Sequence, residues 1–109
     1  PPAIAIHDYL TRLNNYLHPE LPVLLGLLVY AERISRSRGV SVCGPDAVHR
    51  FVLAGLVLGA KALGDTYYED GFCARVGGVN SRELAGLEVA LCRLLDWRLH
   101  CSVEELRWA

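Results

Sequence analysis

Apolar residues recur along the chain at intervals of three and four positions, and this spacing predicts helices almost throughout. Between residues 6 and 17 the apolar side chains follow one face, which is the pattern of an amphipathic helix. A second helix is predicted from near Pro19 to Gly39, and its residues 21–31 are apolar on every face, as in a helix at the centre of a fold. No strand-like alternation lasts beyond three or four residues, so the pattern favours an all-α fold of about five helices with short loops.

Glycine and proline mark the boundaries in the middle of the chain. Residues 39–45 form a predicted connector, and the third helix is expected from Pro45 to about Leu63, with Gly64 as its stop. Residues 65–79 are the one irregular stretch, although the apolar side chains in its second half could pack as a short helix. Two adjacent glycines signal a turn at its end.

Two capping signals define the last helices. Asn80 precedes Glu83 by three residues, and Ser102 precedes Glu105 by the same interval, which is the spacing of a capping box. We therefore expect one leucine-faced helix that runs to about Trp97, and another that starts where the chain ends.

The uncharged apolar run of residues 51–60 is far shorter than the ~20 residues of a membrane-spanning helix. It predicts a buried helix instead, and no membrane partner is expected. Within it Gly55 and Gly59 lie four positions apart on one face, where they would permit the close approach of a neighbouring helix.

The charge balance gives no reason to expect nucleic acid as a partner. The chain has 109 residues, 52% of them hydrophobic, and a formal net charge of −1, so it has no strong field to attract nucleic acid or an anionic membrane. Its length suits a single domain, residues 1–109. It begins with two prolines and contains no Met, which favours a domain excised from a longer protein. We expect a monomer when it is free.

Residues that could carry catalysis or bind a metal are scattered. The gaps between successive cysteines are 30, 19 and 9 residues, too wide for the close pairs of a zinc site, and no two histidines lie three or four positions apart. Phosphate-binding loops and catalytic serine motifs are also missing from the sequence. The sequence predicts a protein that is not an enzyme and has no cofactor or metal. Its thiols are expected to stay reduced in the cytoplasm or nucleus; they are Cys43, Cys73, Cys92 and Cys101.

Two charged residues lie among apolar helix positions. Lys61 has apolar neighbours on both sides in the third helix, and Glu88 projects into the apolar arc of the fourth long helix. Charged groups are seldom fully buried without a partner. Lys61 could extend to solvent, or the two residues could form an internal ion pair. Alternatively, the two helices border a groove with a cation and an anion at its rim, which would suit the capture of a partner's helix.

Four segments carry a more specific pattern and cover nearly the whole chain: IHDYLTRLNNYL (6–17), LLVYAERISR (27–36), residues 57–88 and LLDWRLH (94–100). The most specific block contains AKALGDTYY and ARVGGVNSREL. These segments resemble a cyclin box, in particular that of the P-type and U-type cyclins of the phosphate-signalling class. The resemblance implies one five-helix cyclin-box repeat and a regulatory subunit that binds and activates a cyclin-dependent kinase, in the cell cycle or in phosphate signalling.

The resemblance also implies which residues would hold the kinase. Lys61 and Glu88 match the family's lysine and glutamate that grip the start of the kinase's regulatory C-helix. The apolar pocket that receives this helix would be formed by four further residues: Leu58, Cys92, Trp97 and Leu99. The bulky aromatic that usually follows the lysine is Ala62 here, which implies a shallower pocket. The alternative reading is a cyclin-fold interaction module that binds a partner other than a kinase.

Overall fold

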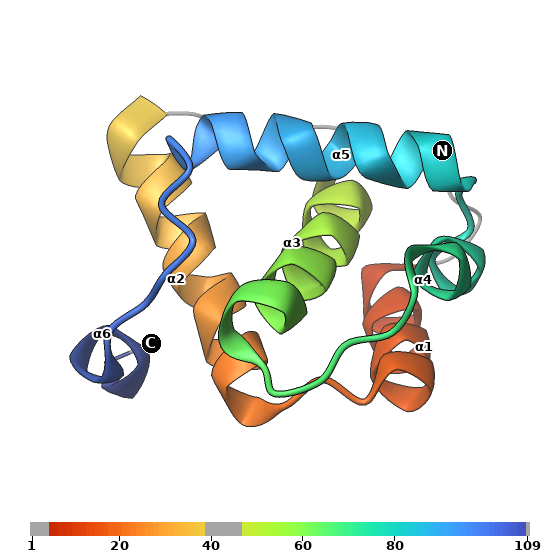
Figure 1. Cartoon of the computed structure of the whole chain (residues 1–109), viewed down its shortest axis with the longest axis horizontal. Coiled ribbons are helices and arrows are strands. Elements are labelled where there is room, and N and C mark those ends of the chain that lie inside the picture. The colour runs from red at the N-terminus through yellow and green to blue at the C-terminus, as the bar shows by residue number, and fades with distance from the viewer. Residues whose placement is uncertain (1–4, 39–46, 109) are drawn as a thin grey trace.

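The computed structural model describes residues 5–38 and 47–108, and these residues form six helices and no strand (Figure 1). The helices are α1 (Ile6–Leu17), α2 (Leu21–Arg38), α3 (Ala47–Leu63), α4 (Asp70–Gly77), α5 (Ser81–Leu94) and α6 (Val103–Arg107). The all-α class is therefore confirmed. The predicted connector 39–45, with Cys43, lies outside the described residues. None of the described helices is long and apolar enough to cross a membrane.

The helix at the centre of the fold is α3, which packs against α1, α2, α4 and α5 (Figure 1). Its residues 52–59 are buried without a break. The expectation that residues 21–31 form the central helix is wrong, because α2 lies at the edge and packs chiefly against α3 and α6. Its outer face leaves Leu21, Leu24 and Leu28 exposed.

The contact between α2 and α3 is close because glycines remove side chains from it. A methyl group on Gly55 would overlap the side chain of Leu27, and one on Gly59 would lie 3.2 Å from Cγ1 of Val23. The predicted close approach on this face of α3 is confirmed. It brings the second half of α3 firmly against α2, which leaves the opposite side of α3 for α4 and α5.

Helix α1 is amphipathic as predicted, but its buried stripe is narrow. Tyr9, Leu13 and Leu17 are buried at intervals of four residues, whereas Leu10 and Tyr16 are exposed. Both were expected on the apolar face. An edge helix that packs chiefly against α3 and α4 buries one stripe, so the neighbouring apolar positions stay at the surface.

The predicted capping residue starts α5, but the helix ends earlier than expected. The side chain of Asn80 accepts a hydrogen bond from the backbone N–H of Glu83 at 2.7 Å. The helix stops at Leu94 rather than Trp97, because Asp96 and Trp97 adopt positive φ angles of 53° and 60°.

The irregular stretch and the last helix follow their turn signals. The apolar half of the irregular stretch forms α4, and Gly78 ends it at a φ of 76°, a conformation that glycine adopts without strain. Ser102 and Glu105 form the predicted capping box at the start of α6.

Candidate functional site

Lys61 and Glu88 meet where α3, α4 and α5 come together. The Nζ of Lys61 donates to Oε1 of Glu88 at 2.8 Å, and it also lies 2.9 Å from Oδ1 of Asp70. Lys61 belongs to the last turn of α3, and Asp70 is the first residue of α4. Each charge therefore also complements the dipole of its own helix. The cluster ties three helices together.

Exposure rises from Glu88 through Lys61 to Asp70. Their side chains are 11%, 32% and 46% exposed. Two of the alternatives drawn from the sequence therefore hold together. Lys61 forms an internal ion pair with Glu88, and its ammonium also reaches solvent. Burial lowers the pKa of Lys61, but the hydrogen bonds from Glu88 and Asp70 outweigh burial and raise this pKa above its ordinary value of 10.5. The ammonium is therefore charged at neutral pH.

The four apolar residues of the predicted pocket differ in burial. Leu58 and Cys92 are buried members of the core cluster between α2, α3 and α5, and Leu99 packs against this cluster. Trp97 is 64% exposed. Leu58 lies one turn before Lys61 on α3, and Cys92 lies one turn after Glu88 on α5, so each pair shares a helix face.

The thiols around this cluster are unreactive in character. Burial, reinforced by the charge of Glu88, raises the pKa of Cys92, and burial with the charge of Asp70 raises that of Cys73. Within the described residues Cys73, Cys92 and Cys101 are free and buried. That part of the chain also contains no group of three or more His, Cys, Asp or Glu side chains placed to hold a metal.

Sequence reasoning missed Asp70 and Arg33. Asp70 belongs to a stretch that looked irregular, and the only available signal was an acidic residue at the start of a short apolar segment. Arg33 donates to the carbonyl oxygens of Arg98 and His100 at 2.7 and 3.0 Å, which holds the segment after α5 against α2. Backbone acceptors more than 60 residues away leave no trace in a sequence pattern.

Comparison with known proteins agrees with this architecture. The family model named Cyclin matches residues 1–99. PHO85 cyclin-7 of Saccharomyces cerevisiae is 34% identical over 97% of this chain, and Cyclin-U1-1 of Arabidopsis thaliana is 34% identical over 93% of it. The Nuc-1 negative regulatory protein preg of Neurospora crassa is 33% identical over 90%. The chain spans 41%, 48% and 20% of these three relatives respectively. On the family match and these relatives, the chain belongs to the cyclin family, in its P/U-type class.

Proposed function

We propose that this chain binds a cyclin-dependent kinase and activates it by gripping the start of the kinase's C-helix with Lys61 and Glu88. Held inward, that helix lets the catalytic Lys–Glu pair and the metal-binding Asp of the kinase align. The chain acts as a regulatory subunit and is not itself the enzyme.

The observation that carries the proposal is the partly exposed Lys61 ammonium above the nearly buried Glu88. An ammonium has three N–H donors, and two of them are used by Glu88 and Asp70. The third is available to a backbone carbonyl of the kinase, while the Glu88 carboxylate accepts from N–H groups at the start of a helix.

Trp97 would supply the apolar anchor beside these charges. Large aromatic residues are enriched among the side chains that dominate binding at interfaces. Leu58 and Cys92 would form the floor beneath, and Leu99 would close the pocket behind Trp97.

The proposal is tested by titrating the chain against a panel of cyclin-dependent kinases that includes PHO85, after which two of the relatives are named. Binding should raise the activity of at least one kinase several-fold. Lys61→Ala and Glu88→Ala should each weaken that binding about 30-fold or more, since truncating one side of a desolvated charge contact costs ~2–5 kcal/mol. Trp97→Ala should weaken it at least tenfold.

Trp108→Ala is the matched control, because Trp108 is 85% exposed at the C-cap of α6 and is not part of the proposed site. It should leave affinity and activation unchanged. A kinase that binds but stays inactive would contradict the activator role. Normal binding by Lys61→Ala and Glu88→Ala, with both variants folded, would remove the proposed site. Failure of the unaltered chain to bind any kinase of the panel would favour a module for other partners.

A further inference from the structure

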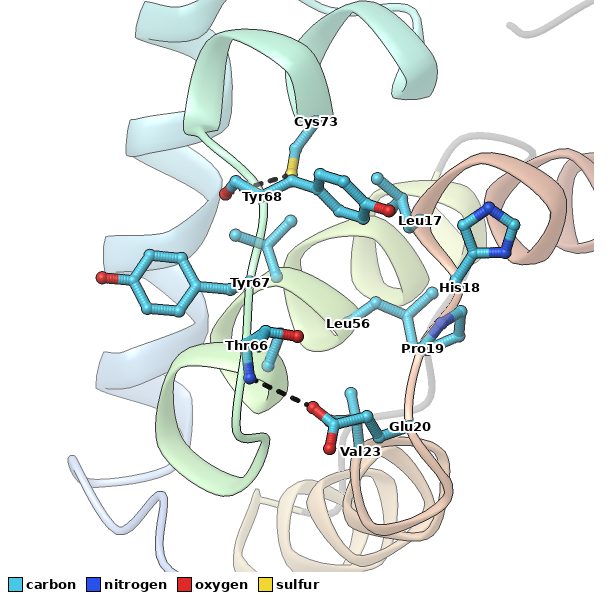
Figure 2. A pocket seen from close by; sticks show the side chains of 12 residues that line it. Leu17, His18, Pro19, Glu20, Val23, Leu56, Thr66, Tyr67, Tyr68 and Cys73 are labelled. Atoms are coloured by element: carbon cyan, nitrogen blue, oxygen red, sulfur yellow. Dashed lines mark hydrogen bonds between the residues drawn. The ribbon is translucent and has the colours of Figure 1, made fainter.

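A second site opens on the other side of α3, between the link from α1 to α2 and residues 66–68 (Figure 2). It is a cavity of about 260 Å³. Its apolar walls are formed by Leu17, Pro19, Val23, Leu56, Val57 and Ala60. Most of these residues belong to the buried core around α1, so the cavity reaches down to the core. None of the six proposed kinase-binding residues lines it.

The edge of the cavity carries a fixed carboxylate. Oε2 of Glu20 accepts hydrogen bonds from the backbone N–H groups of Asp65 and Thr66 at 2.8 and 3.3 Å. Figure 2 shows the second of these bonds and the Glu20 side chain beside Val23. Glu20 is the only acid among the described residues that line the cavity, and none of them is Arg or Lys. The lining also contains one histidine, His18; with that histidine neutral, the formal charge at this opening is negative.

An aromatic ring completes the opening. Tyr68 is 43% exposed, and its ring reaches toward Leu17, whereas the ring of Tyr67 turns to the other side (Figure 2). The ring of Tyr68 packs against that of Phe72 at an angle of 44°, with the ring centroids 5.1 Å apart. The ring of Tyr68 therefore closes the end of the cavity next to Leu17, whereas the carboxylate of Glu20 lies at the end next to Val23 (Figure 2).

We propose that this cavity binds a small organic cation, with one apolar ring inside and an ammonium group at the opening. The ring would contact Leu56 and Val57, and the ammonium would pair with the carboxylate of Glu20. A dry cavity of about 150 Å³ already holds benzene, so the larger volume here accommodates one ring with a short chain. The proposal is independent of kinase binding.

Three ligands with the same ring and different head groups test the charge: 2-phenylethylamine, 2-phenylethanol and phenylacetate. They are titrated into the isotope-labelled full chain and followed by amide NMR. The amine should shift the signals of residues 66–68 and bind about tenfold more tightly than phenylacetate, and salt should narrow this difference. Equal affinities for amine and carboxylate would overturn the proposal.

Two variants test the location. Glu20→Gln keeps an oxygen that accepts from Asp65 and Thr66 but loses the charge. It should weaken amine binding about fivefold and leave the alcohol unaffected. Ala60→Leu fills the cavity and should abolish binding of all three ligands. Its matched control is Ala90→Leu on an exposed position of α5, which should bind normally.

Amine binding that survives Ala60→Leu would place the ligand elsewhere on the protein and would end the proposal. Glu20→Gln decides the question by itself if Ala60→Leu does not fold, since unchanged amine affinity in this variant contradicts the ion pair. A blocked Lys-Phe peptide serves as the last comparison. Much tighter binding of that peptide than of the free amine would assign the cavity to a segment of a partner protein and overturn the small-molecule proposal.

Discussion

At the scale of single residues, the charge cluster is asymmetric. Lys61 pairs with two acids, so the loss of one leaves it the other as well as access to solvent. Glu88 is 11% exposed, and within the described part of the chain Lys61 is the cation that pairs with it. Removing Lys61 therefore leaves the nearly buried carboxylate of Glu88 without its cation, whereas removing Glu88 leaves Lys61 paired with Asp70.

We expect Lys61→Ala to lower the free energy of unfolding by about 2–4 kcal/mol, because a buried charge loses its partner. Glu88→Ala should cost less than about 1 kcal/mol, since Lys61 keeps Asp70. Urea denaturation measures both values. The double variant Lys61→Ala, Glu88→Ala should be more stable than Lys61→Ala, as it contains no stranded carboxylate. Equal losses in the two single variants would contradict this asymmetry.

Lys61 and Glu88 could be singled out from the sequence because helical spacing puts each among apolar neighbours. Their contact with Asp70 could not, since it depends on where the link after α3 returns to the bundle. The exposure of the Trp97 side chain could not be predicted either. Its leucine neighbours continue the helical spacing, but the positive φ angles of Asp96 and Trp97 turn its side chain out to solvent.

At the scale of elements, α6 is the helix that is least buried against the rest of the protein. It has five residues, none of them buried, and it packs against α2. Its start depends on the carboxylate of Glu105, which accepts from the backbone N–H of Ser102 and from Arg33. Short helices of this kind depend on such capping and tertiary contacts, because their own hydrogen bonds do not offset the cost of nucleation.

Acid should release α6. The hydrogen bond from the Ser102 backbone, followed by that from Arg33, lowers the pKa of Glu105 from 4.5 to about 2. Because the folded value lies below the unfolded one, the stabilisation is complete above pH 4.5 and is lost as the pH falls toward 2. The amide NMR signal of Ser102, followed through an acid titration, should report this loss.

Glu105→Gln is the control for this titration, because it carries no carboxylate at that position. The Ser102 signal should then stay flat between pH 4.5 and 2. A transition of the same size in the variant would assign the acid response to another group. The capping box that sets this behaviour was readable from the sequence, since its two members are three residues apart. The bond from Arg33 was not.

At the scale of the whole molecule, neighbours decide which apolar helix is central. Residues 21–31 and 51–60 are both rich in apolar side chains, and the first looked more central because every face is apolar. In the fold α3 is surrounded by α1, α2, α4 and α5, whereas α2 has an open outer face. Composition indicates how much surface a helix can bury, but the topology determines how much neighbouring surface there is to cover it.

The same topology gives Arg33 a role that spans the chain. Its guanidinium donates to the carbonyls of Arg98 and His100 and to the carboxylate of Glu105, and its side chain is 16% exposed. The planar guanidinium of Arg33 thus joins α2 to a segment more than 60 residues later, at the point where the chain leaves α5. Tyr30 adds a parallel bond, since its hydroxyl donates to the carbonyl of Leu99 at 2.8 Å.

Arg33→Lys should loosen this segment while leaving the rest of the bundle folded. A lysine keeps the charge but has no planar fork, so it cannot reach the three acceptors at once. We expect amide hydrogen exchange over residues 98–107 to accelerate at least tenfold, with little change in α3. Arg36→Lys is the matched control, because Arg36 is 80% exposed and pairs with Glu32 on its own helix at 3.2 Å. Exchange that stays slow in Arg33→Lys would show that Tyr30 and the apolar contacts of Leu99 and Cys101 hold the segment without the fork.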